Sequence, residues 1–436
     1  MKSFLYILYV LLFAIVGCST NKKNDPFVSV KKNQFYSGGA PYYFIGANYW
    51  YGGLLGNSEQ GKQRIMKELD FLQSKGVNNL RVLAATEGEG QIHGVARTQP
   101  PFQSKKGVFE EDVLKGLDFL LSEMGKRNMK AVVFLSNNWE WSGGFLQYLN
   151  WNGLIEDSVL RRRLNWDEMR DYVSRFYGCD SCKKDYNSQV EKIVSRVNTV
   201  NGKEYSHDEA IMAWELANEP RPMRPSANDQ YKQWISDAAA LIKSLDHHHL
   251  VTTGNEGEMG TESIDLFSAI HQDKNIDYAT IHIWPKNWSW FTDTAIAKGF
   301  DKVLSNTNSY IDKHAAAARK FGKPLVIEEF GLPRDQQSFS LESSTYSRDK
   351  YYTIIFNALA SSVDKKDVIA GANFWAFAGT GRPSGKSGIW WQKGDDLLGD
   401  PPMEEQGLNS VFDSDRSTWN IIESFTKRIN ENASKQ

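Results

Sequence analysis

Eight short apolar stretches, rich in β-branched and aromatic residues, alternate with amphipathic helical stretches along this chain of 436 residues. Near-continuous apolar character is typical of parallel strands that are buried on both faces. Strands that alternate with helices build α/β folds, and eight such pairs can close into a (β/α)8 TIM barrel. We therefore predict a single α/β barrel, with strands at residues 44–49, 79–83, 131–135, 211–216, 250–253, 278–283, 325–329 and 372–377.

The segments outside these strands follow a recognisable order. Residues 27–30 and 34–36 flank a polar turn and predict a short N-terminal β-hairpin. An insertion at about 137–187, after the third strand, has a mostly helical pattern, and long loops follow the sixth and eighth strands at 284–291 and 379–403. Loops that follow the strands of a barrel lie at its catalytic face. We expect these three segments at that face.

The N-terminus has the features of an export signal. Lys2 precedes an apolar run at residues 4–16, which is too short for a comfortable membrane span and has the length of a signal-peptide core. Gly17-Cys18-Ser19 follows and resembles a bacterial lipoprotein signal, whose cleavage leaves a lipidated cysteine. We predict a signal peptide at 1–17, lipidation of Cys18, a tether at 18–26 and the barrel domain at 27–436. The protein would be an exported lipoprotein, anchored in a membrane by its lipid alone and facing the periplasm or the cell surface.

Only two cysteines remain after Cys18, and Cys179 and Cys182 have a C-x-x-C spacing. This spacing occurs in redox motifs and in half-sites for zinc. Zinc needs four ligands, and neither a second cysteine pair nor a nearby His-x-x-x-His is present. A redox motif would need a strand–turn–helix setting, whereas this pair lies between helical stretches. In an oxidising compartment we predict a structural disulfide.

The charge pattern argues against nucleic acid as a partner. The chain has 51 Lys and Arg against 53 Asp and Glu, a net charge of −2, without the basic surplus or stripe of a nucleic-acid-binding protein. Its 14 Trp, 18 Tyr and 23 Phe fit either a large core or a sugar-binding cleft, because the C–H faces of pyranose rings stack on aromatic planes. Composition alone favours the core.

Two carboxylates stand out at the predicted strand ends, where barrels place their catalytic residues. Glu219 follows the fourth strand and Glu329 ends the seventh, so both can converge across the barrel mouth. The alternation of side chains along a strand predicts that only one of Glu328 and Glu329 faces the interior. Two carboxyl groups about 5–5.5 Å apart can hydrolyse a glycosidic bond with retention, whereas inversion needs about 6.5–9.5 Å. Repulsion at the shorter distance raises the pKa of one carboxyl and keeps it an acid.

The residues around these carboxylates resemble glycoside hydrolase family 5, in clan A. Residues 214–221, Trp-Glu-Leu-Ala-Asn-Glu-Pro-Arg, look like the acid/base motif, and residues 324–331, Pro-Leu-Val-Ile-Glu-Glu-Phe-Gly, look like the nucleophile motif. The resemblance runs from about residue 27 to about residue 424. It implies that Glu219 is the general acid/base, that Glu329, which precedes Phe-Gly, is the nucleophile, and that the enzyme is retaining and needs neither cofactor nor metal.

The same resemblance implies roles for further residues. Arg81 would hold the nucleophile ionised, and Asn218 would contact the 2-hydroxyl of the sugar in subsite −1. His282 matches the histidine of the sixth strand, and Trp375 would be the platform under that sugar. The family usually has a tyrosine two residues after this histidine, whose hydroxyl contacts the nucleophile. Here Trp284 takes that place, and an indole N–H can donate a hydrogen bond but cannot accept one.

Within the family, the sequence is most similar to the endo-β-1,4-mannanases of fungal and plant type. The runs that carry this similarity are 46–50, 137–139, 218–221, 254–257 and 284–288. They imply a β-mannan, glucomannan or galactomannan substrate. An exo-acting β-mannosidase or mannobiohydrolase is a close alternative, and another family 5 β-glucanase is a further one. The implied substrate contacts, with Trp139 and Arg221 on the leaving-group side, are Trp50, Asn138, Trp139, Arg221, Glu256 and Trp288.

Two other classes of protein are weighed against this reading. A non-catalytic glycan-binding lipoprotein would lack a carboxylate, whereas both are present. A metal-dependent barrel hydrolase would place His or Asp at several strand ends, whereas only His282 lies at one. The histidines at 247–249 precede the fifth strand, at the opposite end of the barrel, and are expected to cap a helix. We expect the protein to be a monomer.

Overall fold

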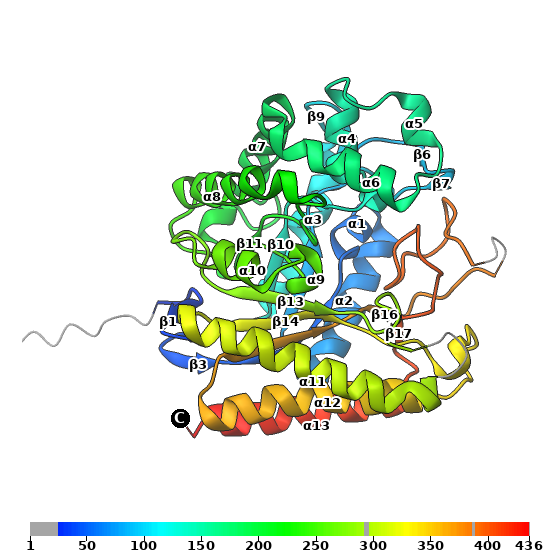
Figure 1. Ribbon diagram of the computed structural model, residues 1–436. Helices are drawn as coiled ribbons and strands as arrows, with labels where there is room; N and C mark the ends of the chain where they lie inside the picture. The colour runs from blue at the N-terminus through cyan, green and yellow to red at the C-terminus, as the bar shows by residue number, and fades with distance from the viewer. Residues whose placement is uncertain (1–24, 292–295, 386–388, 436) are drawn as a thin grey trace, which may run out of the picture.

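The computed structural model describes residues 25–291, 296–385 and 389–435, so the predicted signal peptide and Cys18 lie outside the described residues. Its centre is a parallel eight-stranded sheet in the order β12-β11-β10-β5-β4-β15-β14-β13. Figure 1 labels β10, β11, β13 and β14 of this sheet. The strands are β4 (Phe44–Asn48), β5 (Asn79–Leu83), β10 (Lys130–Phe134), β11 (Ile211–Glu215), β12 (Leu250–Thr252), β13 (Ala279–Ile283), β14 (Leu325–Phe330) and β15 (Ile369–Phe374). The predicted α/β barrel is confirmed.

The sheet curls round until its two outer strands, β12 and β13, come together. The N–H of Asp277 donates to the carbonyl of Val251 at 2.8 Å, and the N–H of His282 donates to that of Glu256 at 3.0 Å. These bonds satisfy backbone groups that an open edge would leave unpaired. The carboxyl ends of all eight strands therefore surround one mouth.

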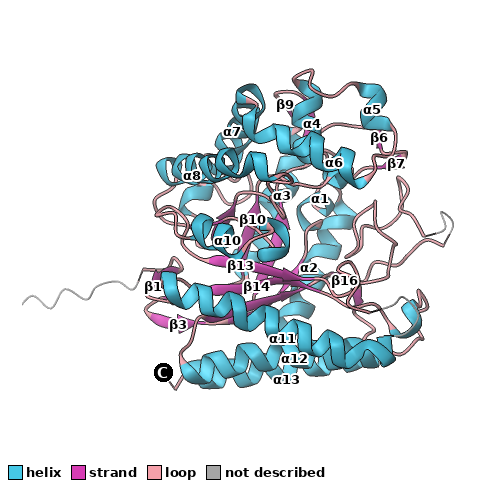
Figure 2. Ribbon diagram, viewed as in Figure 1, coloured by secondary structure: helices cyan, strands magenta, loops and turns pink. Residues whose placement is uncertain are grey.

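Helices surround the sheet (Figure 2). Several of them bury an apolar face. In α3, for example, Leu117, Leu120 and Leu121 are buried, as its 3.6-residue apolar period predicts. The larger helices are α2 (Glu59–Ser74), α3 (Glu111–Lys126), α7 (Asp180–Val194), α8 (Asn228–Leu245), α10 (Ile264–His271), α11 (Ile296–Phe321), α12 (Tyr346–Lys365) and α13 (Arg416–Ala433). Among the described residues, no helix is both long and apolar enough to cross a membrane.

The eighth strand begins three residues earlier than predicted. β15 includes Gly371, whose α-carbon lies so close to the Phe44 ring that an added β-carbon would be 2.3 Å from its Cζ. This close approach requires a glycine at position 371, although glycine is uncommon in a central strand. As a result Trp375 follows the strand instead of lying within it, and stands at the barrel mouth.

The N-terminal segment forms a three-stranded antiparallel sheet, not the predicted two-stranded hairpin. Its strands are β1 (Ser29–Lys31), β2 (Gln34–Ser37) and β3 (Ala40–Tyr42). The third strand exists because Gly38 and Gly39, both with positive φ, make a two-residue turn that pairs Ser37 with Ala40. Phe35 of this sheet packs edge-on against Tyr278 at 5.2 Å, which covers the amino-terminal end of the barrel.

Long segments lie on the catalytic face. The insertion after β10 contains α4 (Gly144–Trp151), α5 (Asp157–Arg161) and α6 (Trp166–Val173) before α7. The segment after β5 adds two small hairpins that the sequence did not reveal, β6 (Gln91–Ile92) with β7 (Val95–Ala96) and β8 (Gln103–Lys105) with β9 (Val108–Phe109). The segment after β15 contains β16 (Phe377–Gly379), which pairs with β17 (Val411–Phe412). The remaining α-helices are α1 (Gly52–Leu55) and α9 (Glu258–Thr261).

The C-x-x-C cysteines and one histidine of the run at 247–249 lie outside the barrel mouth, and the structure shows what each of them contacts. Cys179 and Cys182 are joined by a disulfide at the start of α7. His249 does not cap α8 as expected. Its ring lies between the carboxylate of Asp246, 2.6 Å from Nδ1, and the carbonyl of Asp208, 3.0 Å from Nε2. This buried ring is therefore satisfied by groups of the loops at the amino-terminal end of the barrel.

Candidate active site

Glu219 and Glu329 reach the barrel mouth from different strands. Glu219 lies four residues beyond the end of β11, where its own N–H donates to the carbonyl of Gly254 at 3.0 Å and that of Asn218 donates to Ser136 at 2.9 Å. The backbone of Glu219 has φ 49°, a left-handed conformation that is rare for a residue other than glycine. These neighbouring loops therefore fix the direction of its side chain. Glu329 belongs to β14 itself.

Arg81 of β5 connects the carboxylates in the barrel centre. Its guanidinium donates to both oxygens of Glu215, at 2.6 and 2.7 Å, and to Oε1 of Glu329. It also donates to the amide oxygens of Asn48 at 3.0 Å and Asn218 at 2.8 Å. Arg81 has no exposed surface, so these acceptors satisfy a fully desolvated cation. The expected contact between Arg81 and Glu329 is thus present.

The expectation that only one of Glu328 and Glu329 faces the interior is wrong. Glu328 Oε2 lies 3.4 Å from Nε2 of His282 and 3.8 Å from Nε of Arg81, so both carboxylates point inward. The pairing of β13 with β14 shifts at this point, because Ile281 pairs with Ile327 but His282 pairs with Glu329. Glu328 is the extra residue of a bulge, which interrupts the alternation of side chains.

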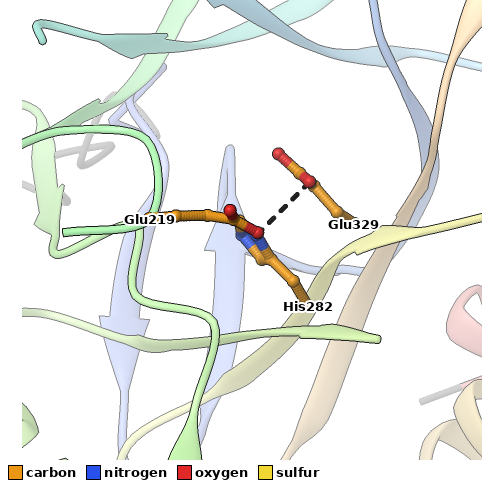
Figure 3. A group of neighbouring side chains, drawn as sticks. All are labelled: Glu219, His282 and Glu329. Atoms are coloured by element: carbon orange, nitrogen blue, oxygen red, sulfur yellow. Dashed lines mark hydrogen bonds and ion pairs between the residues drawn. The ribbon is translucent and has the colours of Figure 1, made fainter. Parts of the chain in front are cut away.

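His282 lies between the two candidate catalytic carboxylates (Figure 3). Its Nδ1 is 2.7 Å from Oε1 of Glu219 and 3.4 Å from Oε2 of Glu329. One ligand atom from each of the three side chains lies within 4.8 Å of the others. A second donor reaches Glu219 from the side, because Nε1 of Trp139 donates to its Oε2 at 2.5 Å.

Burial dominates the electrostatics of this group. Burial raises the pKa of Glu329 well above that of a free carboxyl, Arg81 lowers it, and the negative charge of Glu219 raises it further. Burial likewise raises the pKa of Glu328 and lowers the pKa of His282, whose ring is therefore neutral near pH 7. Arg81 thus acts in the expected direction on Glu329 without offsetting the desolvation of its carboxyl.

Trp284 makes the contact that the usual tyrosine would make. Its Nε1 donates to Oε2 of Glu329 at 3.2 Å. Its ring also packs edge-on against Trp375, with centroids 5.8 Å apart, and both line the cleft. The substitution of Trp for Tyr therefore preserves a hydrogen-bond donor to the candidate nucleophile.

The predicted leaving-group side forms a rigid wall. Arg221 binds Glu256 through two parallel hydrogen bonds of 2.7 and 2.8 Å, and its guanidinium lies 4.9 Å from the ring centre of Trp139. The pKa of Glu256 is raised to about 7 by burial, with Arg221 acting in the opposite direction. The residues that line the cleft, of about 870 Å³, include Trp139, Trp166, Asn218, Glu219, Arg221, Glu256, Trp284, Trp288, Glu329, Trp375, Trp390, Met403 and Glu404.

Two predicted substrate contacts do not line this cleft. Trp50 has no exposed surface, because the segment after β15 covers it and its Nε1 donates to the carbonyl of Gly399 at 2.8 Å. Asn138 is also fully buried, and its side-chain oxygen accepts from the N–H of Arg221 at 3.3 Å. Both residues support the walls of the site instead of facing a ligand.

The site also contains residues that the sequence does not predict. Glu215 accepts a hydrogen bond from Arg81, and Glu328 lies next to His282, whereas the two motifs predict roles only for the neighbouring Glu219 and Glu329. Glu215 could have been found from strand alternation, since it lies at the end of β11. Trp166 and Glu404 come from the insertion and the last loop, where no sequence pattern predicts which side chains turn inward.

The spacing of Glu219, His282 and Glu329 would permit a shared metal ion, but their neighbours oppose one. Arg81 already places a guanidinium on Glu329, which would repel a cation. Trp139 and Trp284 direct N–H groups at the two carboxylates. These donors suit a carboxylate pair that holds one proton and one negative charge.

Comparisons with known proteins agree on one family. Residues 25–434 match the family model described as glycoside hydrolase family 5 β-mannosidase-like. Mannan endo-1,4-beta-mannosidase 1 of Arabidopsis thaliana is 29% identical over 373 residues, which cover 80% of this chain and 81% of that protein. Among solved structures, the family 5 mannosidase from Rhizomucor miehei has a TM-score of 0.85 at 32% identity and covers 95% of this chain and 100% of its own. The endo-1,4-beta-mannanase from the same organism shares the fold, with a TM-score of 0.65 at 22% identity over 94% of this chain and 100% of its own. This chain therefore belongs to glycoside hydrolase family 5, in its β-mannosidase-like group, and is a glycoside hydrolase.

Proposed function

We propose that the enzyme hydrolyses β-mannosidic bonds with retention, with Glu329 as nucleophile and Glu219 as general acid/base. The observation that carries this proposal is the separation of the two carboxylates, whose facing oxygens lie within 4.8 Å. The carboxyl groups of a retaining pair lie about 5–5.5 Å apart, because the nucleophile attacks the anomeric carbon directly and no water molecule has to fit between them. Trp375 would support the sugar that is attacked, as the resemblance implies.

The reaction would proceed by double displacement. Glu329 attacks the anomeric carbon while Glu219 gives its proton to the departing glycosidic oxygen, which leaves a covalent glycosyl-enzyme. Glu219, now a carboxylate, removes a proton from water, and the resulting hydroxide equivalent displaces Glu329. Neutral His282 can accept a hydrogen bond from protonated Glu219 through Nδ1, 2.7 Å away. Asn218 keeps one N–H free for the sugar, because its oxygen accepts from Arg81 and its amide group donates once to Asn137.

Rescue by azide tests the two roles. Glu219→Ala should lose most activity on unactivated substrates, and azide should restore turnover of aryl glycosides with good leaving groups and yield a β-glycosyl azide, since azide needs no general base. Glu329→Ala should lose essentially all activity. A Glu219→Ala variant without azide rescue would contradict the acid/base assignment, and an α-configured first product of the wild type, seen by NMR, would contradict retention.

The proposed substrate is β-1,4-linked mannan, glucomannan or galactomannan. The names of the relatives in Arabidopsis thaliana and in Oryza sativa subsp. japonica, mannan endo-1,4-beta-mannosidase 1 in each case, support this class. A complex of the Rhizomucor miehei mannosidase holds mannosyl-fructose, which supports a mannosyl group at the attacked position. The test compares the rates at which the enzyme hydrolyses linear mannan and carboxymethyl cellulose. Faster hydrolysis of mannan would support this proposal, and faster hydrolysis of carboxymethyl cellulose would indicate a β-glucanase.

Cleavage at chain ends is a second candidate, favoured by the segment after β15. Lys286 of the loop after β13 pairs with Glu405 of that segment at 3.1 Å, so the two loops meet beside the cleft. Within the described residues, nothing at the end of β4 lines the cleft, because Gly399 covers Trp50. Such a wall would limit the room for sugars beyond subsite −1. An enzyme of this kind should release mannose or one short product from linear mannan from the first minutes, whereas fragments of random length would support internal cleavage.

We further propose that the enzyme is an exported, monomeric lipoprotein attached through Cys18. Lys2, the apolar run and Gly17-Cys18-Ser19 support this proposal, and the Cys179–Cys182 disulfide suits an oxidising compartment. Incorporation of labelled palmitate into the wild type, and its loss in Cys18→Ala with release of the protein from membranes, would be the expected result. Size-exclusion chromatography with light scattering measures the oligomeric state.

A further inference from the structure

We propose that Trp166 forms an additional sugar subsite on the leaving-group side of the cleft. This inference rests on the proposed hydrolysis of β-mannosidic bonds and extends it to a residue outside the catalytic barrel. Trp166 is 51% exposed, which is unusual for so large an apolar side chain, and it lines the same cleft as Glu219. An exposed indole in a cleft is suited to stacking against the C–H face of a sugar.

The position of Trp166 continues the direction in which a leaving group departs. Glu219, the proposed acid, accepts from the indole of Trp139 at 2.5 Å. The ring of Trp139 in turn stacks on that of Trp166, with centroids 6.2 Å apart and planes inclined by 29°. The guanidinium of Arg221 lies beside both rings, 4.9 Å from the first and 5.8 Å from the second. Glu219, Trp139 and Trp166 therefore lie in a row. Trp166 lies about one sugar unit beyond Trp139, on the side away from the proposed acid.

Local structure holds Trp166 in place without substrate. It is the first residue of α6, and Asn165 and Glu168 form a capping box through two hydrogen bonds of 3.0 Å. A capping box fixes the first turn of a helix, so the indole is presented from a defined backbone. Arg221 is likewise fixed by its two bonds to Glu256. Little ordering is then needed when a sugar binds, which favours affinity.

The ligand class follows from this geometry. An apolar plane next to a fixed guanidinium suits a neutral ring with a C–H face and peripheral hydroxyls, which is a mannosyl or glucosyl unit of the leaving chain. A small aromatic leaving group would end near Trp139 and would not reach Trp166. The residue should therefore distinguish oligosaccharide substrates from aryl glycosides.

The test compares two substrates in the same variants. In Trp166→Ala, kcat/KM for mannotetraose should fall at least about tenfold, while kcat/KM for 4-nitrophenyl β-mannoside stays within about threefold of wild type. Trp166→Phe keeps a planar ring and should retain most activity on mannotetraose. Trp166→Leu keeps apolar volume without an aromatic plane and should give the same kinetic result as Trp166→Ala. It takes the place of Trp166→Ala in the test if the Tm of Trp166→Ala is too low for the assay. Tyr346→Ala removes an aromatic ring that is 65% exposed outside the cleft and should change neither value.

The possible failures are distinct. If both kcat/KM values in Trp166→Ala stay at the wild-type level, the subsite is overturned. An equal fall on both substrates at unchanged Tm would also overturn it, because Trp166 would then act by positioning Trp139 and Glu219. A wild-type enzyme without turnover of either mannoside would overturn the proposed function itself.

Discussion

Trp284 shows how one side chain can replace another at a catalytic centre while keeping its electrostatic effect. Its N–H donates to Oε2 of Glu329 at 3.2 Å, next to the charge supplied by Arg81. Both donors stabilise the ionised carboxylate, whereas burial and Glu219 favour the neutral form. The balance at Glu329 therefore depends on few groups, and removing one donor should be visible in the pH profile.

We predict that Trp284→Phe raises the pKa of Glu329 further. Activity requires this carboxylate to be ionised, so the acid limb of the kcat/KM profile should move to higher pH, and kcat should fall about 10- to 100-fold. Trp284→Tyr offers a hydroxyl donor in place of the indole and should recover part of both losses. The measurement is kcat/KM for an aryl β-mannoside from pH 4 to 9. An acid limb that stays in place in Trp284→Phe would show that this hydrogen bond does not act on the nucleophile.

At the scale of elements, Glu87 joins the segment after β5 to the insertion after β10. Its carboxylate accepts from the N–H of Gly144 at 3.0 Å and from the hydroxyl of Tyr148 at 3.1 Å. Burial raises its pKa to about 7, although Gly144, Tyr148 and Arg97 all act in the opposite direction. The contact between these two segments is therefore sensitive to pH in the neutral range.

We predict that Glu87 makes the fold less stable as the pH rises from about 4.5 to about 7. In this window the unfolded chain has released the proton while the folded protein still holds it, so the group costs roughly 3 kcal/mol once the pH exceeds 7. Glu87→Gln keeps one oxygen that can accept from the N–H of Gly144, its NH2 group can donate to the hydroxyl oxygen of Tyr148, and it cannot ionise. Its free energy of unfolding relative to wild type should thus increase between pH 5 and pH 8, as measured by denaturant titration. Glu89→Gln, at an exposed site two residues away, is the matched control, and a change with pH of equal size in the two variants would refute the prediction.

The sequence predicted the elements of the barrel better than the contacts between them. The strands were recognisable because each is buried on both faces, a property that local composition reveals. The candidate pair was recognisable because Glu219 and Glu329 lie at strand ends. The prediction that Trp50 contacts substrate is wrong because Gly399, which covers its ring, lies 349 residues away in the chain. The prediction for Glu328 is wrong because a bulge depends on the register of two strands, which no single stretch of sequence encodes.

At the scale of the whole molecule, the barrel supplies the chemistry and the last loop shapes access to it. Asp400 organises that loop from a buried position: it accepts from the N–H groups of Gly407, Asn409 and Ser410 at 3.0 to 3.1 Å and from the hydroxyl of Ser410 at 2.6 Å. Arg348 of α12 donates to the carbonyls of Leu408 and Ser410, both at 3.1 Å, which ties the loop to the outer helices. The loop is thus a fixed wall of the cleft.

We predict that Asp400→Ala loosens this wall without disturbing the catalytic pair. Three backbone N–H groups and one hydroxyl would lose their acceptor, at a local cost of at least about 2 kcal/mol, so amide hydrogen exchange should increase in residues 400–410. Because Met403 and Glu404 line the cleft from this loop, KM for mannooligosaccharides should rise about tenfold and the products from linear mannan should become more varied in length. Asp396→Ala is the matched control, since Asp396 is exposed in the same loop and accepts from the N–H of Arg382 at 3.0 Å. Faster exchange in Asp400→Ala with an unchanged KM and unchanged products would mean that the loop covers the barrel without shaping its specificity.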